Sequence, residues 1–406
     1  MKHEANARPG AARLGSFYYE QRISLSEKMR IAVWNTAFLG DAVLTLPLLQ
    51  TLRRAYPQSR LDFYVRRGVE GLFQNHKALS GVYPYDKRGT GGGFKAALAY
   101  GAELRARGYD LWVSAHQSPR SAFMAWQSRA KERVGYSSPW VNRLFYTKVT
   151  ERMFPRLHEV DRLLRLAARL GLKDFSTWPE VELAPSVRER TGIFFSALRD
   201  RPLLGLHPGS VWGSKRWPTE YFASLALLAL KAGARVMLFA GAGEEDYAAN
   251  TLERIQAQTP EKKLWRPTPS STTDPNRKTA LGEDARPAAA EADVLDMSAR
   301  LDLVELAACI AELDCYVSND SGPMHLAWAQ RTPVVAMFGP TIAGLGFAPR
   351  GESSVVMEVR GIACRPCGLH GPVTCPQGHH RCMRDLLPDM VWPEVQRRLL
   401  DSGLIN

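Results

Sequence analysis

Residues 313–346, LDCYVSNDSGPMHLAWAQRTPVVAMFGPTIAGLG, carry the pattern that decides the fold of this chain. The apolar, β-rich run at 315–317 predicts a buried strand, and residues 324–330 predict a helix. A second apolar run at 333–338 predicts another buried strand, ended by a Gly-Pro pair. A strand, a turn, a helix and a strand in this order are typical of an α/β domain with a parallel sheet.

The turn between the first strand and the helix holds Asp320, Ser321 and Gly322. A helix N-terminus has free N–H groups and the positive end of the helix dipole, so this turn suits a bound phosphate. The alternative is structural, since Asp320 or Ser321 can cap the helix while Gly322 keeps the turn tight. On this stretch alone the two interpretations stand level.

Composition narrows the class of protein. A chain of 406 residues suits two domains, and 45% hydrophobic with 23% charged residues is typical of a soluble globular protein. No apolar run is long enough to span a bilayer and the first thirty residues lack a signal-peptide core, so we expect a cytoplasmic protein. The net charge of +12 indicates an acidic partner: a nucleic acid, an anionic membrane surface or a phosphorylated substrate.

Strands alternate with helices from residue 29 onward, which predicts parallel sheets with right-handed crossovers. The polar segment 1–28 lacks periodicity, and we expect it to be a disordered extension. Pro47 should kink the helix predicted at 42–56. The first strands are predicted at 31–34, 61–65 and 109–113.

The alternation of strands and helices is interrupted at about residues 181–201, where we place the linker between the domains. A second alternation begins at residue 203, and a segment rich in Pro, Thr and Lys interrupts it as an exposed insertion. The expected organisation is an N-terminal domain at 29–190, a C-terminal domain at 200–385 with the insertion at 256–291 and a Cys-rich segment at 361–385, and a C-terminal helix within 386–406.

Two strand-end loops offer catalytic or phosphate-binding groups. Asp41 follows the first strand, at the sheet edge where ligands sit, so it is a candidate general base, with helix capping as the structural alternative. The loop at 207–218 joins small polar residues such as Ser210 to Lys215, whose mobile charge suits a phosphate. There the alternative is a solvated Lys-Arg pair, and we favour the functional interpretation.

Two further constellations are weaker. Glu244 and Glu245 follow a glycine turn after a strand, where a carboxylate can accept hydrogen bonds from a ribose, although both also suit a helix start. Four cysteines near the C-terminus can wrap one tetrahedral metal ion, or remain reduced thiols in a small packed subdomain. These are Cys364, Cys367, Cys375 and Cys382.

Together these motifs resemble glycosyltransferase family 9, the ADP-heptose:lipopolysaccharide heptosyltransferases, and within it the heptosyltransferase II-like members. The resemblance covers about residues 29–400, without the segment after residue 256. Its marks are Leu39-Gly40-Asp41 with Leu46-Pro47, His207-Pro208-Gly209-Ser210 with Lys215-Arg216-Trp217-Pro218, residues 241–245, residues 319–325 (NDSGPMH) and Phe338-Gly339-Pro340-Thr341. Several such motifs in order, each at a strand end, form a specific signal.

The resemblance implies a GT-B fold: two Rossmann-like domains with parallel sheets facing a cleft, and a C-terminal helix that crosses back to the N-terminal domain. It implies that Asp41 removes the acceptor proton and that Lys215 contacts the donor diphosphate. One or both of Glu244 and Glu245 would bind the ribose. The remaining donor-side residues implied are Ser210, Asp320, Ser321, Gly322 and His325.

The same resemblance implies an inverting transfer of heptose from an ADP-heptose-like nucleotide sugar to a lipopolysaccharide precursor at the inner face of the inner membrane. A peripheral membrane contact fits this acceptor, and no nucleic acid is expected. Lys215 and a helix N-terminus can stabilise the leaving diphosphate, so catalysis is expected to need no cofactor. Part of the family has a C-terminal cysteine set, which favours a structural Zn or Fe at the cysteines here. Arg120 is a candidate for an acceptor phosphate, with a surface role as the alternative.

The chain departs from the family pattern at Asn35-Thr36, where a lysine is common after the first strand. Two other functions remain open from the sequence. One is a GT-B relative that uses another nucleotide sugar or a protein acceptor, including a nucleotide-sugar epimerase. The other is a non-enzymatic basic surface-binding protein, against which the scatter of Arg and Lys through both halves argues.

Overall fold

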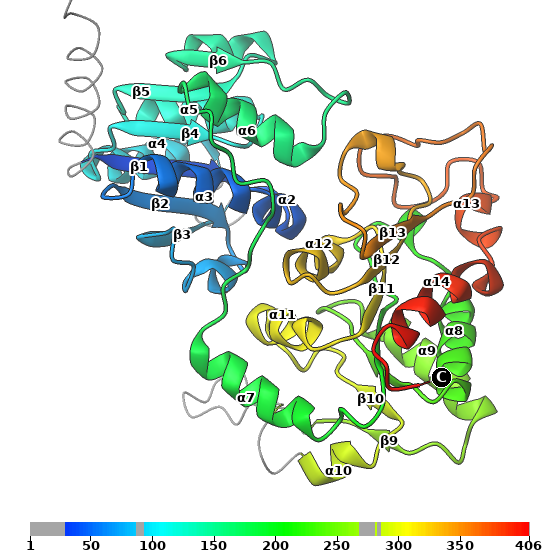
Figure 1. Cartoon of the computed structure of the whole chain (residues 1–406). Coiled ribbons are helices and arrows are strands. Elements are labelled where there is room, and N and C mark those ends of the chain that lie inside the picture. The colour runs from blue at the N-terminus through cyan, green and yellow to red at the C-terminus, as the bar shows by residue number, and fades with distance from the viewer. Residues whose placement is uncertain (1–28, 87–92, 268–280, 282–285, 406) are drawn as a thin grey trace, which may run out of the picture.

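A computed structural model of the chain describes residues 29–86, 93–267, 281 and 286–405. Two α/β domains, each built on one parallel sheet, lie next to one another (Figure 1). The GT-B architecture expected from the sequence is therefore confirmed. The predicted extension at 1–28 lies outside the described residues.

The N-terminal domain has a six-stranded sheet with the order β3-β2-β1-β4-β5-β6, and every pairing is parallel. Strand β1 lies inside the sheet, and its last five residues are buried, as expected for a parallel strand covered on both faces. The strands are β1 (Arg30–Asn35), β2 (Arg60–Arg66), β3 (Gly81–Tyr85), β4 (Leu111–Ser114), β5 (Glu132–Tyr136) and β6 (Lys148–Thr150).

Five α-helices connect or follow these strands. The helix predicted at 42–56 is in fact two, and Pro47 lies in the first turn of the second, where its missing N–H costs nothing. The predicted kink is thus a complete break. Helix α4 was not predicted. The helices are α2 (Leu39–Leu44), α3 (Leu46–Ala55), α4 (Gly93–Ala106), α5 (Pro119–Gln127) and α6 (Glu159–Arg169).

The C-terminal domain has a seven-stranded sheet with the order β13-β12-β11-β7-β8-β10-β9, again parallel throughout. The predicted strands at 315–317 and 333–338 correspond to β11 and β12, and the predicted helix between them begins two residues earlier than expected. The strands are β7 (Leu203–His207), β8 (Arg235–Leu238), β9 (Leu264–Trp265), β10 (Val294–Asp296), β11 (Cys315–Asn319), β12 (Val334–Met337) and β13 (Ser354–Met357).

The helices of this half revise the expected boundaries. Helix α7 lies inside the predicted linker and packs on α11 of the C-terminal domain. The insertion expected at 256–291 is partly structured, because β9 pairs with β10 and α10 follows. The helices are α7 (Pro185–Ser196), α8 (Thr219–Lys231), α9 (Glu245–Gln258), α10 (Arg286–Ala290), α11 (Leu303–Ala311), α12 (Gly322–Ala329), α13 (Arg381–Arg384) and α14 (Pro388–Leu400).

The C-terminal helix differs from the expectation. Instead of crossing back to the N-terminal domain, α14 makes its main contacts with α8, β11 and β12 (Figure 1). Its apolar residues Val391, Val395 and Leu399 are fully buried in the core of the C-terminal domain. Burial of this apolar stripe against its own domain provides the hydrophobic free energy that holds the helix there.

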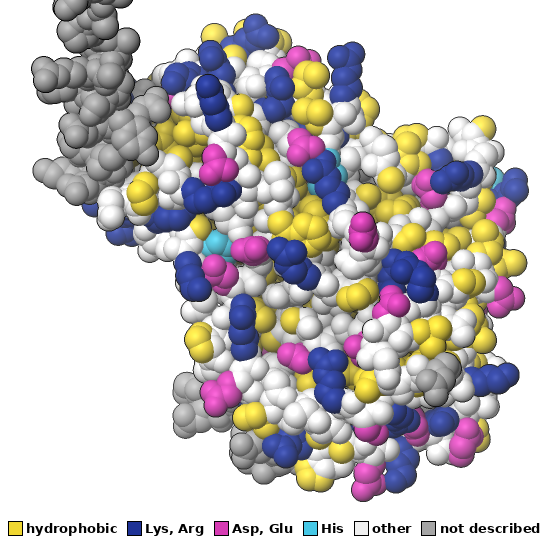
Figure 2. All heavy atoms as spheres, in the orientation of Figure 1, with side chains coloured by type: hydrophobic (Ala, Val, Ile, Leu, Met, Phe, Trp, Pro, Cys, Tyr) yellow, Lys and Arg dark blue, Asp and Glu magenta, His cyan; other side chains and the backbone are white. Residues whose placement is uncertain are grey.

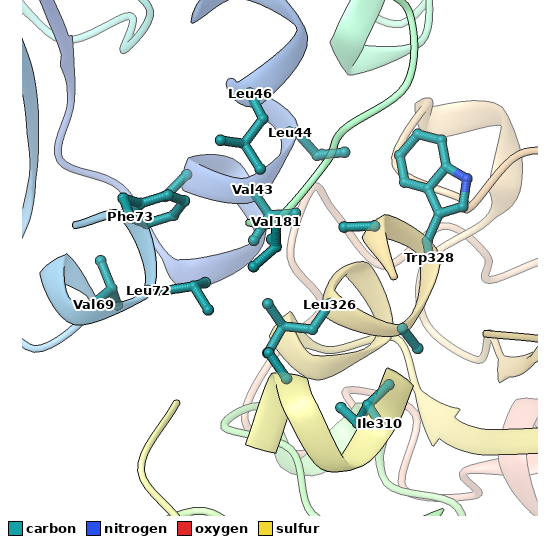
Figure 3. Close-up of a cluster of buried hydrophobic side chains, with 14 of the residues drawn as sticks. Val43, Leu44, Leu46, Val69, Leu72, Phe73, Val181, Ile310, Leu326 and Trp328 are labelled. Carbon is teal, nitrogen blue, oxygen red and sulfur yellow. The ribbon is translucent and has the colours of Figure 1, made fainter. Parts of the chain in front are cut away.

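One hydrophobic core extends across both domains. Figure 3 shows Val43, Leu44 and Leu46 of the N-terminal domain facing Leu326 and Trp328 on α12, with Ile310 below them. At the centre of this contact α2 packs directly on α12. Since α2 begins just before Asp41 and α12 begins just after Asp320, this packing brings the two predicted half-sites together. Within the described residues no helix combines the length and the apolar composition that spanning a bilayer requires.

Candidate active site

Two connected cavities lie where the domains meet. The first, of about 240 Å³, is lined from the N-terminal side by residues 38–41 and from the C-terminal side by strand-end loops. The second, of about 540 Å³, lies mainly on the N-terminal domain. Five residues line both cavities, so the two meet there: Phe38, Asp41, Phe347, Leu369 and His370.

The first cavity gathers nearly all the residues predicted for the site. The predicted base lies in the same cavity wall as seven of the eight predicted donor-side residues, which come from three segments of the C-terminal domain: the loops after β7 and β8, and the turn after β11 together with α12. These are Asp41 with Ser210, Lys215, Glu244, Asp320, Ser321, Gly322 and His325.

Asp41 stands in the first turn of α2, and its Oδ2 accepts a hydrogen bond from the Phe38 N–H at 3.2 Å. Burial raises the pKa of this carboxyl to about 6, and the nearby negative charge of Glu159 adds to the rise. The Phe38 N–H and the positive charge of Arg152 act in the opposite direction. A carboxylate with a pKa of about 6 is mostly ionised at neutral pH yet basic enough to accept a proton.

Glu159 holds a buried charge cluster beside Asp41. Both its carboxylate oxygens accept from Nη2 of Arg152 at 2.7 Å, and Oε2 also accepts from Nη1 of Arg162 at 2.8 Å. Arg162 in turn donates through Nη2 to the Leu345 carbonyl of the other domain at 2.7 Å. The sequence interpretation missed these three residues, although Glu159 and Arg162 lie at helix spacing.

The Asp320 carboxylate accepts hydrogen bonds from two side chains and is not the N-cap of α12. Its Oδ2 accepts from Nζ of Lys215 at 2.6 Å and from Oγ1 of Thr341 at 2.6 Å. The helix N-cap residue is Ser321, whose side chain makes no capping hydrogen bond. Ser321, Gly322 and Pro323 line the cavity, so the N-terminus of α12 lies at its wall without a side-chain cap.

Asn319 fixes the lysine loop to the end of β11. Its Oδ1 accepts from the Trp217 N–H at 2.9 Å, and its Nδ2 donates to the Pro208 and Gly209 carbonyls at 2.9 and 3.2 Å. This fully buried amide thus holds both ends of the loop that carries Lys215. The sequence placed Asn319 in a motif without giving it a role.

The structure separates the two glutamates. Glu244 lines the first cavity, and its Oε2 contacts Nε2 of the buried His207 at 3.0 Å. Burial alone would raise the pKa of Glu244, but its hydrogen bond to His207 and the charge of that ring hold it below the usual value. The other ring nitrogen of His207 contacts the Tyr316 hydroxyl at 2.9 Å. Glu245 lines a different pocket, and its Oε2 accepts from the Gly243 N–H at 2.7 Å.

His325 projects from α12 to the first turn of α2. It is 5% exposed, burial lowers its pKa to about 4, and its Nδ1 has no hydrogen-bond partner. A Cβ atom placed on Gly40 would lie 2.6 Å from Cδ2 of this ring. The close approach of the two domains at this point therefore requires glycine at position 40.

Arg120 lies on α5 and is not among the residues that line either cavity. Its guanidinium sits 5.7 Å from the ring centroid of Tyr85, which does line the second cavity. The positive charges in the wall of that cavity are Arg66, Arg67 and Arg152. No periodicity or motif in the sequence pointed to these three arginines.

The structure does not support the predicted metal site at the cysteines. No group of three or more His, Cys, Asp or Glu side chains is arranged to hold a metal ion in the described part of the chain. Cys364 Sγ lies 3.8 Å from Nε2 of His379, whereas Cys367 Sγ donates to the Cys364 carbonyl at 3.2 Å. Burial raises the pKa of the Cys382 thiol to about 11.

The Cys-rich segment instead holds two loops that line the first cavity. Arg365 donates through Nη2 to the Phe338 and Thr341 carbonyls at 3.0 and 2.9 Å. His380 Nε2 contacts the Ser214 carbonyl at 2.6 Å. One segment thus holds the loop before Lys215 and the loop that presents Thr341 to Asp320.

The arrangement has the parts that displacement of a phosphorylated leaving group requires. A carboxylate base faces a cavity whose opposite wall has a buried lysine and an open helix N-terminus. A positive charge and free N–H groups stabilise the negative charge that develops as a phosphate leaves. The neighbouring cavity, with its three arginines, can hold a second, acidic substrate beside the base.

A family model described as glycosyltransferase family 9 (heptosyltransferase) matches residues 97–265 and 276–369. The lipopolysaccharide heptosyltransferase 2 of Salmonella typhimurium is 25% identical over 391 residues, which cover 93% of this chain and all of that protein. The lipooligosaccharide heptosyltransferase 2 of Campylobacter jejuni is 24% identical over 377 residues, covering 93% of this chain and all of that protein.

Solved structures of similar proteins share the fold. A glycosyl transferase family 9 structure from Veillonella parvula superposes with a TM-score of 0.74 at 22% identity, covering 92% of this chain and 98% of its own. The E. coli ADP-heptose lps heptosyltransferase II structure gives a TM-score of 0.68 at 22% identity, covering 92% of this chain and all of its own.

Proposed function

The chain belongs to glycosyltransferase family 9, and from this membership we propose that it transfers heptose from ADP-heptose to an inner-core lipopolysaccharide acceptor with inversion. Its relatives across nearly their full length are heptosyltransferases named for lipopolysaccharide or lipooligosaccharide. The observation that carries the proposal is that Asp41 shares one cavity with the Lys215–Asp320 pair and the N-terminus of α12.

In the proposed reaction an acceptor hydroxyl attacks the anomeric carbon of the donor. A bond forms between that oxygen and the carbon while the bond from the carbon to the diphosphate oxygen breaks, and the electron pair leaves with ADP. Asp41 takes the hydroxyl proton, so the acceptor oxygen does not carry a positive charge. The carboxylate is ionised at neutral pH, because its pKa is about 6.

Lys215 and α12 act on the leaving group. The ammonium group is held at 2.6 Å from Asp320, so it is positioned before the substrate arrives. The N–H groups at the start of α12 add fixed dipoles without a reorganisation cost. Glu244, oriented by His207, is the carboxylate in this cavity suited to the ribose hydroxyls, in preference to Glu245.

The second cavity takes the acceptor. Arg66, Arg67 and Arg152 line it, and guanidinium groups bind phosphates and carboxylates in a bidentate manner. Asp41 lies where the two cavities meet, so a hydroxyl of a molecule in the second cavity can reach a donor in the first. The sequence assignment of this role to Arg120 is replaced by these three arginines in the proposal.

The test uses purified Asp41→Asn protein, an isosteric change that removes the base. We expect ADP-heptose to raise the thermal stability of the variant as it does that of the wild type, because only a folded protein binds the donor. Transfer to a heptose-acceptor oligosaccharide should fall by about 10²- to 10⁴-fold. Transfer at the wild-type rate would refute the role of Asp41, and failure of every ADP-heptose-type donor to stabilise the wild type would refute the donor class.

A further inference from the structure

The outer surface of α5 and the short 3₁₀ helix η2 (Trp140–Leu144) exposes an apolar patch on the N-terminal domain. Trp140 is 74% exposed, Leu144 67% and Trp126 38%. Trp126 stacks on Phe123 at a ring-centroid distance of 5.8 Å and meets Phe145 edge-on at 6.3 Å. Large apolar side chains grouped in this way on a charged surface mark an interaction site.

The same surface is strongly basic. From Gln117 to Thr150 the sequence has six Arg and Lys residues but one acid, Glu132. Glu132 pairs with Lys148 at 2.5 Å. Arg129 and Arg143 are exposed, and within the described residues neither pairs with a carboxylate. Arg129 lies 5.4 Å from the ring centroid of Trp126, so charge and aromatic surface are adjacent.

The space-filling view agrees with this composition. Figure 2 shows dark blue Lys and Arg side chains interspersed with yellow hydrophobic ones along the upper edge of the N-terminal domain, over the region labelled β6 in Figure 1. Aromatic rings that sit at the headgroup level beside cations that attract anionic lipids are the usual means by which a protein lies on a membrane surface.

The patch is continuous with the wall of the second cavity. Gln117 lines that cavity and donates through Nε2 to the Ser138 carbonyl at 2.8 Å, two residues before Trp140. Arg120, on the first turn of α5, lies over Tyr85, which also lines the cavity. When the patch lies on a bilayer, the second cavity is therefore close to molecules anchored in that bilayer.

We propose that α5 and η2 form a docking surface for an anionic lipid bilayer, with Trp140 and Leu144 entering the headgroup layer and Arg129 and Arg143 pairing with lipid phosphates. The proposal rests on the proposed function in one respect, that the acceptor is anchored in the same bilayer. Docking converts the search for the acceptor from three dimensions to the plane of the membrane. In the described part of the chain neither Trp140 nor Leu144 lines the first or the second cavity, so the patch acts apart from the chemistry.

The first test is sedimentation of the full chain with vesicles of phosphatidylglycerol and phosphatidylcholine, compared with phosphatidylcholine alone. We expect the wild type to bind only the anionic vesicles and to be released by salt. The double variant Arg129→Gln/Arg143→Gln should bind roughly tenfold to thirtyfold more weakly, from about 1 kcal/mol for each cation. Trp140→Ser/Leu144→Ser should also bind more weakly, because it removes the inserting side chains.

A matched control removes apolar side chains that are exposed on the other domain. Met390 and Leu400 on α14 are 49% and 38% exposed, and Met390→Ser/Leu400→Ser should bind vesicles as the wild type does. Equal loss in this control and in Trp140→Ser/Leu144→Ser would overturn the proposal. So would wild-type binding to neutral vesicles as tight as to anionic ones, or binding to RNA with none to vesicles.

The second test separates docking from catalysis. With a delipidated acceptor oligosaccharide in solution, both patch variants should transfer at the wild-type rate; with the same acceptor anchored in anionic vesicles, their rate should fall about tenfold or more. A loss of rate on both acceptors would overturn the docking role. Vesicle binding is measured without any substrate, so its result stands even if the proposed donor or acceptor proves wrong.

Discussion

Nζ of Lys215 lies 2.6 Å from Oδ2 of Asp320, and this contact joins two loops that are 105 residues apart in the sequence. Both side chains are nearly buried, at 10% and 9% exposure. Asp320 thereby orients the lysine, and the hydroxyl of Thr341 satisfies the same carboxylate oxygen. The pair lies in the wall of the first cavity, where we propose that the donor binds.

Replacement of Lys215 by Met should affect both catalysis and folding. We expect the transfer rate to fall by about 10²- to 10³-fold, the usual cost of removing one group that stabilises a developing negative charge. The free energy of unfolding should fall by about 3 kcal/mol, because Asp320 is left buried without its cation. In Lys215→Met/Asp320→Asn most of the stability should return while activity does not. Chemical denaturation and initial rates measure the two effects, and equal stability of the single and double variants would contradict the pairing.

The pH dependence of transfer should report on Asp41. We expect the rate to rise with pH through about 6 as the carboxyl ionises. Glu159→Gln should move this rise to lower pH, because it removes the negative charge that raises the pKa of Asp41. Arg152→Gln should move it to higher pH, because it removes a positive charge.

The exposed Glu151 provides the control for these two variants, and Glu151→Gln should leave the pH–rate profile unchanged. The test is the full profile of kcat/KM, since a purely structural defect lowers the rate at every pH without moving the midpoint. Movement of both midpoints in one direction would contradict the electrostatic role of the cluster.

Asp41 should also make stability depend on pH. Its pKa in the folded protein, about 6, is above the ordinary value of 3.8, so the folded state holds the proton more tightly than the unfolded state. Its contribution is therefore fully present below about pH 4 and is lost as the pH rises through 6. Because the side chain reaches both cavities, solvent reduces the expected loss to about 2 kcal/mol.

Asp41→Asn should therefore be more stable than the wild type at pH 8, and the two should converge as the pH approaches 4. Denaturant midpoints measured across this range test the expectation. An Asp41→Asn protein less stable than the wild type at pH 8 would show that the carboxylate is stabilised in the folded state, contrary to the pKa.

Gly40→Ala should destabilise the protein although alanine favours a helix. Its Cβ would lie 2.6 Å from the ring of His325, so the interface of α2 and α12 must open, at a cost of about 1–3 kcal/mol. Gly192→Ala in α7 is the control, since nothing lies within 4 Å of its Cβ, and it should gain about 0.5–1 kcal/mol. Thermal melts compare the two. A Gly40→Ala protein as stable as the wild type would show that the domains separate freely at this point.

The alternation of strands and helices, and the meeting of Asp41 with the strand-end loops of the C-terminal domain, could be predicted because each depends on local signals. Apolar runs end at polar turns, and parallel strands collect their carboxyl ends at one edge, which is why Asp320 and Lys215 meet. The break at Pro47 was foreseeable from the fixed φ and missing N–H of proline. These features need no knowledge of which residues pack against which.

The sequence could not reveal relationships that depend on tertiary contact. Glu244 and Glu245 are neighbours in the chain, but the fold places Glu244 in the cavity wall beside His207 and Glu245 in a different pocket. Arg152 and Glu159 lie in a loop and at a helix start that show no motif, but folding places them beside Asp41. The cysteines had a metal-like spacing, whereas the fold uses Arg365 between them to hold carbonyl groups. The C-terminal helix was assigned to the wrong domain because an amphipathic pattern does not indicate which surface the apolar side of a helix packs against.

The core that passes from α2 and α3 into α11 and α12 has a consequence for how this protein can be divided. Either half produced alone would expose Leu44 and Leu46, or Leu326 and Trp328, to water. We therefore expect the isolated halves to aggregate. Exchange of a domain with a relative should succeed only if both sides of this interface between the domains are exchanged together. Although the chain has two sheets, we expect the two domains to be exchangeable only as a single unit.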